Sequence, residues 1–297
     1  MADIYGVDAY APKEVAERVE KVGVTKARLP FLSQITLGIL GGGFIGFGAL
    51  YYTLVISDSS LGFAASRLLG GFAFSLGLIL VVIAGAELFT GNNLLVMAWT
   101  SREISTRELL RNWAVIWCAN FVGAAGLALL VVLSNHDAMN GGAIGVQAVK
   151  IAAAKTSLPF GEALVKGILC NTLVCLAVWL AMAGRTVVDK VVALVMPVSA
   201  FVAAGFEHSV ANMYFISLGL MLKDSTALPE TVYSSNLTAL GFAQNLVPVT
   251  LGNLIGGVVF VALAYYIVYR RRVVGEHRLS RGWTLARLAG VMGMMAK

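Results

Sequence analysis

The sequence predicts an all-α membrane protein with six transmembrane helices, arranged as a 3+3 inverted repeat in which the second and fifth spans are interrupted. Three observations lead to this fold class. First, 58% of the residues are apolar, only 13% are charged and the mean hydropathy is +0.81, whereas a soluble domain carries roughly a quarter charged residues. Second, the chain contains six long uncharged runs. Third, two of these runs carry the same polar motif.

Residues 1–30 form an amphipathic segment ahead of the first apolar run. Between Pro12 and Arg28, Val15, Val19 and Val22 share one helical face and charged residues occupy the rest. Such a helix is expected to lie on the membrane surface or under a neighbouring protomer. The polar start does not resemble a cleaved secretory signal, so we expect the amino terminus to stay in the cytoplasm.

Six uncharged runs follow, each about as long as a spanning helix, which needs roughly 20 residues. They define a transmembrane domain over residues 31–270, and a basic tail, expected in the cytoplasm, covers residues 271–297. The runs extend from Leu29 to Ser57, Leu68 to Ala86, Asn112 to Asn135, Gly167 to Gly184, Val191 to Phe206 and Thr231 to Tyr269.

The distribution of Lys and Arg supports six spans with both termini inside, because these residues collect on the cytoplasmic side. In this topology the inner segments hold seventeen of the 22 Lys and Arg residues. The net charge of +6 therefore reflects topology and attraction to anionic lipid headgroups, and no nucleic-acid partner is expected.

The polar motif A-G-x-E-x-x-x-x-N occurs twice, as AGAELFTGN from Ala84 and as AGFEHSVAN from Ala204. Shorter similar motifs occur in the third and sixth spans (NFVG and NLIG) and in the first and fourth spans (GIL in both). Together they predict two halves of three spans, over about residues 31–135 and 160–270. An odd number of spans per half forces the second half into the membrane upside down, as in many transporters.

Glu87 and Glu207 lie where the two interrupted spans are expected to break, near the midplane. A charged residue at the centre of a spanning helix costs on the order of 2.5 to 3.5 kcal/mol, so these carboxylates should face a cavity or a partner. A structural alternative, which we favour for the glutamates, is that they accept hydrogen bonds from backbone groups freed at the breaks.

His208 occupies the break of the fifth span, where the first half has Leu88. The chain has only two other histidines: His136 beside Asp137 in a connection, and His277 in the tail. An imidazole has an unperturbed pKa of about 6.5 and exchanges a proton near neutral pH. We therefore favour a functional role for His208 over a structural one.

The segments AGAELFTGN, KGILCNTLVCLAVW, GFEHSVANM and PVTLGNLIGG resemble those of the formate/nitrite transporter family, over roughly Val15 to Tyr269. This resemblance implies an inner-membrane homopentamer in which each protomer has its own pore and an aquaporin-like helix arrangement. It also implies that the permeant ligand is a small monovalent anion such as formate or nitrite.

By the family's pattern, His208 is the central pore histidine, Thr90 faces it and Asn171 lies nearby on the fourth span. Lys155 matches a basic residue near the outer vestibule, and Glu207 resembles the acid paired with that region. Two hydrophobic constrictions are implied on either side of the histidine. The positions that match them are Phe74, Leu78, Leu88, Phe89, Val174 and Phe201.

These residue types suit anion passage on physical grounds. Apolar rings strip water from the ion, which is costly for a bare carboxylate, while Lys155 can concentrate anions and Thr90, Asn171 and an imidazole N–H can donate hydrogen bonds. The expected function is a formate channel gated by hydrophobic constrictions around His208, with proton coupling left open. Nitrite, or hydrosulfide, is the alternative substrate.

Other classes of membrane protein fit less well. No enzymatic activity, cofactor or metal is expected, because a membrane metalloenzyme would need several ligands and no HExxH motif occurs. Cys118, Cys170 and Cys175 all lie in apolar spans and are interpreted as small buried hydrophobes. The paired Asn-Pro-Ala signature of water and glycerol channels is absent. A purely structural protein would leave two glutamates and His208 unexplained.

Overall fold

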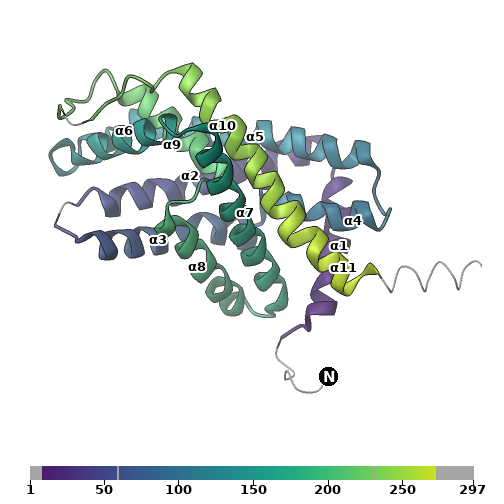
Figure 1. Ribbon diagram of the computed structural model, residues 1–297. Helices are drawn as coiled ribbons and strands as arrows, with labels where there is room; N and C mark the ends of the chain where they lie inside the picture. Colours follow the sequence, from purple (N-terminus) through teal and green to yellow (C-terminus); the bar gives the residue numbers. More distant parts are fainter. Residues whose placement is uncertain (1–8, 59, 231, 272–297) are drawn as a thin grey trace, which may run out of the picture.

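The computed structural model describes residues 9–58, 60–230 and 232–271. Throughout these residues the regular elements are helices, packed as a bundle (Figure 1). Six helices are long and apolar enough to cross a membrane, which confirms the predicted number. They cover Phe31–Ile56, Phe63–Gly85, Thr106–Leu133, Phe160–Ala183, Val187–Ala204 and Ala239–Tyr269. Most of the predicted tail, residues 272–297, lies outside the described residues.

The first part of the chain runs from α1 to α5. Between η1 and η2 lie five non-helical residues, 86–90, which we call the first break. The elements are α1 (Pro12–Ala27), α2 (Phe31–Ile56), α3 (Phe63–Ile79), the π-helical η1 (Leu80–Gly85), the 3-10 helix η2 (Gly91–Leu95), α4 (Val96–Thr100) and α5 (Thr106–Leu133).

Two short 3-10 helices, η3 (His136–Ala138) and η4 (Asn140–Gly142), lead into the second part. Here residues 205–208 separate α8 from α9, and we call them the second break. The elements are α6 (Ala143–Thr156), α7 (Phe160–Ala183), α8 (Val187–Ala204), α9 (Ser209–Leu222), α10 (Ala239–Ile255), the π-helical η5 (Gly256–Leu263) and α11 (Ala264–Tyr269). In Figure 1, α10, η5 and α11 form one long rod.

Local sequence explains where the helices start. Ser105 caps α5 in a capping box with Glu108, and Thr186 caps α8 in the same way with Asp189. Such boxes satisfy backbone N–H groups that have no partner inside the helix. Pro30 and Pro159 immediately precede α2 and α7, where their missing N–H is harmless. These signals set where the spanning segments start.

Close packing of α2 on α5 and of α7 on α10 depends on small residues. A Cβ atom on Gly42 would collide with the backbone carbonyl of Asn120, and one on Gly252 with that of Leu164. Small residues at helix interfaces let backbones approach closely in membranes, where apolar burial alone does not drive association. The outer surface carries exposed apolar side chains such as Leu32, Leu133 and Val188, as expected for contact with lipid or another protomer.

Helix α1 packs its apolar face within its own chain, with Val15 and Val19 buried in a cluster with Leu95 and Ala98. Its predicted place on the membrane surface or under a neighbouring protomer stays a prediction. Gly23 makes this approach possible, because the space for a Cβ is only 3.3 Å from the Ala98 side chain. The apolar face seen in the sequence is therefore satisfied internally, next to the first break.

Candidate functional site

The first break is held by one side chain, Asn120 on α5. Its amide donates to the carbonyl oxygens of Glu87 (2.9 Å) and Gly38 (2.7 Å), and its own carbonyl oxygen accepts from the Phe89 N–H (2.9 Å). The Glu87 N–H donates to the Leu37 carbonyl at 3.1 Å. Backbone groups left unpaired by the interruption are thus satisfied, as a non-aqueous environment requires.

The second break is held in the same way by Asn253 on α10. Its amide donates to the carbonyl oxygens of Glu207 (2.9 Å) and Gly167 (2.8 Å), and its carbonyl oxygen accepts from the Ser209 N–H (2.9 Å). The Glu207 N–H donates to the Lys166 carbonyl at 3.3 Å. Every contact of Asn120 has its counterpart here.

Each break also carries a buried ion pair. Lys26 Nζ lies 2.9 Å from a Glu87 oxygen, and Lys155 Nζ lies 2.9 Å from a Glu207 oxygen. The second carboxylate oxygen of Glu87 accepts from Asn92 (2.7 Å), and that of Glu207 accepts from Asn212 (2.6 Å). Asn112 and Asn245 complete the two sets by accepting from Asn92 and Asn212 and donating to the carbonyls of Lys26 and Lys155.

This arrangement changes the interpretation of the two glutamates. The favoured prediction was that their carboxylates accept hydrogen bonds from freed backbone N–H groups. Their partners are lysine and asparagine side chains, while Asn120 and Asn253 bind the freed backbone. The reason is charge: a buried carboxylate is better compensated by an ammonium and an amide than by backbone N–H groups alone.

His208 is the first residue before α9 and caps it. Its Nδ1 accepts a hydrogen bond from the Ala211 N–H (3.1 Å), and its Nε2 lies 3.0 Å from Thr90 Oγ1. Because Nδ1 is an acceptor, a neutral ring carries its proton on Nε2 and donates it to the threonine hydroxyl. The imidazole is 3% exposed and stacks on Phe201, with ring centroids 6.1 Å apart. The predicted pairing of His208 with Thr90 therefore exists across the two breaks.

Asn171, on α7, connects the two breaks rather than facing the solvent. Its amide donates to the Thr90 carbonyl (3.3 Å), to Asn93 Oδ1 (2.7 Å) and to the Asn253 carbonyl (2.7 Å). The side chain is completely buried. Asn171 lies next to Thr90, as the resemblance implies. It contacts the backbone carbonyl of Thr90 and not its hydroxyl group.

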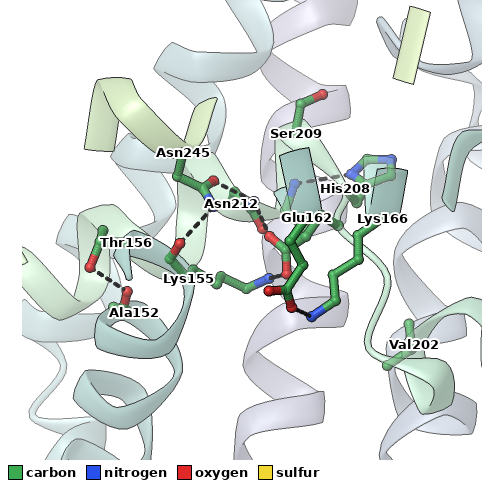
Figure 2. Close-up of polar contacts among 12 residues, drawn as sticks. Ala152, Lys155, Thr156, Glu162, Lys166, Val202, His208, Ser209, Asn212 and Asn245 are labelled. Carbon is green, nitrogen blue, oxygen red and sulfur yellow. Dashed lines mark hydrogen bonds and ion pairs between the residues drawn. The ribbon is translucent and has the colours of Figure 1, made fainter. Parts of the chain in front are cut away.

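Two cavities adjoin the two breaks. The Lys155 vestibule, of about 370 Å³, is lined by Lys155, Glu207, His208, Phe74 and Phe201 among others. Figure 2 shows Lys155 and His208 in this region, together with the ion pair of Lys166 and Glu162. This cavity contains the second break's charged and aromatic residues.

The Lys26 vestibule, of about 290 Å³, is lined by Lys26 and Glu87, by the predicted constriction residues Leu78 and Leu88, and by Val19 of α1. Phe89 and Val174 are buried and line neither of these two cavities. The six predicted constriction residues are therefore divided: two line each cavity, and Phe89 and Val174 lie in the packed core.

Several residues of the site were not predicted. Phe215 stacks on Phe74 (6.5 Å between centroids), and Lys155 Nζ lies 5.4 Å above its ring. Lys26 was counted only as a topology signal. A repeated motif could have shown that Lys26 corresponds to Lys155, since the segments KARLPF (from Lys26) and KTSLPF (from Lys155) share the pattern K-x-x-L-P-F. Asn120 and Asn253 begin the repeated segments NFVG and NLIG, but the sequence assigned them no function.

Among the described residues, no three His, Cys, Asp or Glu side chains lie close enough together to hold a metal ion. The profile of the family described as "Formate/nitrite transporter" matches residues 13–267. The chain belongs to the formate/nitrite transporter family. This assignment confirms the resemblance found in the sequence.

Relatives in this family match nearly the whole chain. Formate channel FocA of Escherichia coli (strain K12) is 39% identical over 89% of this chain and 96% of its own length. Uncharacterized transporter YrhG of Bacillus subtilis (strain 168) is also 39% identical, over 88% of this chain and 94% of its own. These formate/nitrite transporter relatives are described as channels or transporters.

Solved structures agree with the family assignment. A "Pentameric formate channel with formate bound" is 38% identical, with a TM-score of 0.74 over 80% of this chain and 97% of its own. An "FNT family ion channel" is 30% identical, with a TM-score of 0.76 over 86% of this chain and 98% of its own.

Proposed function

We propose that this protein is a membrane channel for formate and related small monovalent anions. The observation that carries the proposal is the contact between His208 Nε2 and Thr90 Oγ1. His208 lines the Lys155 vestibule, and Thr90 belongs to the first break, which the Lys26 vestibule reaches at Glu87 and Leu88. Relatives named as formate channels support formate over nitrite as the permeant anion. Like its relatives, the chain is interpreted as a transporter and not as an enzyme.

The two breaks support a 3+3 inverted repeat. The contacts among Lys26, Glu87, Asn92, Asn112 and Asn120 recur among Lys155, Glu207, Asn212, Asn245 and Asn253. One contact does not recur: Lys26 Nζ also donates to Asn92 Oδ1 (3.0 Å), whereas Asn212 Oδ1 has no partner among the described residues. Since Lys26 lies on α1 and Lys155 on α6, we propose that each repeat begins with a short amphipathic helix, before the three spans. Each interrupted span then presents its break near the midplane.

The proposed path begins at a lysine. The ammonium groups of Lys26 and Lys155 attract an anion into a vestibule, although each is partly compensated by its glutamate. The anion then meets Phe74 and Phe201 on one side, or Leu78 and Leu88 on the other. These apolar side chains strip water from the anion, and the cost excludes ions that find no hydrogen-bond donor beyond.

That donor is the pair formed by His208 and Thr90. In its neutral form His208 holds a proton on Nε2, which can leave the threonine oxygen and donate to a carboxylate. To transfer a proton to the anion, the ring must first gain one on Nδ1, which would remove the acceptor for the Ala211 N–H. Proton coupling therefore requires loosening of the cap on α9, whereas simple anion passage does not.

A pentamer fits the outer surface of this protomer. Apolar residues such as Phe63, Leu130 and Val192 are exposed on the described surface, and a structural relative is a pentameric formate channel. We propose the same assembly, with a pore in each protomer, in the inner membrane. The Lys26 vestibule then faces the cytoplasm together with both termini.

Replacement of His208 by Phe tests this function directly. In liposomes that contain the purified protein, we expect formate flux to fall at least tenfold, since a lost hydrogen bond to a charged group costs roughly 1.5 to 3 kcal/mol. The dependence of flux on pH should also flatten. His136→Asn, in the connection before α6, serves as the control. Unchanged flux and pH dependence in the Phe variant would remove His208 from the mechanism.

A competition experiment tests the substrate. Labelled formate uptake is measured with increasing unlabelled formate, nitrite or hydrosulfide, and we expect formate to compete at the lowest concentration. Stronger competition by nitrite would reassign the substrate within the same family.

A further inference from the structure

The Lys155 vestibule contains more positive charge than its lysine–glutamate pair provides. Besides Lys155, it is lined by Arg67 of α3, Lys150 of α6 and Lys166 of α7. Lys155 and Lys166 are compensated by Glu207 and Glu162, at 2.9 Å and 2.7 Å. Arg67 and Lys150 form no ion pair within the described part of the chain. Two positive charges therefore remain uncompensated at this mouth.

Arg67 is held in a fixed orientation. Its Nε donates to the Ala203 carbonyl (2.9 Å), one terminal nitrogen donates to the Val202 carbonyl (3.1 Å) and the other to the Tyr52 hydroxyl (3.1 Å). A guanidinium has five N–H donors, so two remain for a ligand. Gly205 leaves room for this arrangement, because a Cβ there would lie 2.8 Å from an Arg67 nitrogen.

The Lys26 vestibule lacks an equivalent. Among the described residues that line it, Lys26 is the one cation, and Glu87 compensates it at 2.9 Å. The sequence offset that relates Glu87 to Glu207 leads from Arg67 to Val187, which is apolar. The offset that relates Lys26 to Lys155 leads from Lys150 back to Lys21, which does not line the cavity. The two uncompensated positive charges, Arg67 and Lys150, are therefore found in the Lys155 vestibule and have no equivalent in the Lys26 vestibule.

We propose that the Lys155 vestibule binds a small polyvalent carboxylate, such as a dicarboxylate, between Arg67 and Lys150, and that this anion blocks the pore from that side. The cavity of about 370 Å³ is in the size range of small-molecule sites, about 300 to 1,000 Å³. Two negative charges match the two uncompensated cations. The same two charges prevent passage, because Phe74 and Phe201 would have to desolvate both.

Direct binding tests the site without any transport. Acetate, malonate and tricarballylate, which carry one, two and three carboxylates, are titrated calorimetrically into the purified full-length protein in detergent at low salt. We expect affinity to rise along this series and to fall as salt is added. In Lys150→Gln, malonate should bind about fivefold more weakly, the upper range for one exposed ion pair. Lys21→Gln is the matched control and should bind malonate like the unchanged protein. Equal affinity of Lys150→Gln and the unchanged protein would overturn the site.

Sidedness is tested by flux, and this step rests on the proposed function. Malonate is added outside vesicles of either orientation that contain the protein, and formate flux is measured. Inhibition is expected only where the Lys155 vestibule faces the added malonate, and equal inhibition in both orientations would overturn the one-sided block. If malonate binds in a Lys150-dependent way but no formate flux exists, the proposed function fails while the binding site stands.

Discussion

The two breaks have the same scaffold and different chemistry. In both, an asparagine from a neighbouring helix binds the freed backbone, and a lysine and a second asparagine bind the glutamate. The residue after the glutamate differs: Leu88 in the first break and His208 in the second. The lysines differ in burial as well, with 27% of the Lys26 side chain exposed but only 14% of Lys155. The shared contacts satisfy the backbone groups freed at both breaks, and the difference places an imidazole in the second break where the first has an apolar side chain.

The largest expected effect comes from removal of either lysine. Lys155→Met leaves Glu207 buried without a counter-charge, and loss of one partner of a buried ion pair costs about 3 to 5 kcal/mol. Lys26→Met should cost less, because its more exposed site lets water reach Glu87. Thermal unfolding of the two purified variants in detergent measures this difference. A larger loss for Lys26→Met would contradict the ranking by burial.

Removal of the scaffold asparagines should have the next largest effect, and an equal one in the two halves. Asn120→Ala leaves the Phe89 N–H and two carbonyl oxygens without their partner, and Asn253→Ala does the same around Ser209. Each unsatisfied buried group costs about 1 to 3 kcal/mol, and local relaxation reduces the total to about 3 kcal/mol. Melting temperatures of the two variants should fall together. A loss confined to one variant would show that the scaffolds are not equivalent.

Replacement of His208 by leucine, the residue at the same place in the first break, distinguishes the role of the shared hydrogen-bond network from the role of the imidazole. His208→Leu removes the cap on Ala211 and the contact with Thr90, and loss of a helix cap costs about 1 kcal/mol. We expect a folded protein with a small fall in melting temperature and a large fall in formate flux. Size-exclusion chromatography and liposome flux measure the two properties. Retained flux would mean that the shared scaffold alone conducts.

The smallest effect is expected from Phe215. The sequence offset that relates Glu207 to Glu87 leads from Phe215 to Leu95, an apolar but non-aromatic residue that lines the Lys26 vestibule. Phe215→Leu removes the stacking on Phe74 and the contact with Lys155 while keeping an apolar side chain. Aromatic pairs contribute about 0.5 to 1.5 kcal/mol beyond their buried area. We expect a fall in melting temperature of a few degrees and a wider pore, detected as greater lactate flux relative to formate. Unchanged selectivity would limit Phe215 to a packing role.

The number of membrane-spanning helices could be predicted from the sequence, because each apolar run is long and lacks charge. The structure confirms six. His208 was found because histidine is rare here and sits inside a repeated motif. The partnership of Lys26 with Glu87 was missed for a physical reason. The two residues are far apart in the chain, and a lysine at the end of an amphipathic helix looks like any other cytoplasmic charge until the helix folds back.

The central contacts depended on the resemblance or on the structure. Thr90 and Asn171 are ordinary polar residues in apolar segments, and no periodicity distinguishes them; the family's pattern selected them. Phe215 could not be selected, because a phenylalanine in a buried helix usually serves packing. Only the approach of Phe74 and Lys155 from other helices gives it a position in the vestibule.

Because α1 supplies the ammonium group that compensates Glu87, the amino-terminal helix is not a removable leader. Truncated versions that start at α2 would carry a carboxylate without a counter-charge at the first break. Translation that starts downstream of Lys26 would likewise leave the Glu87 carboxylate without its counter-charge.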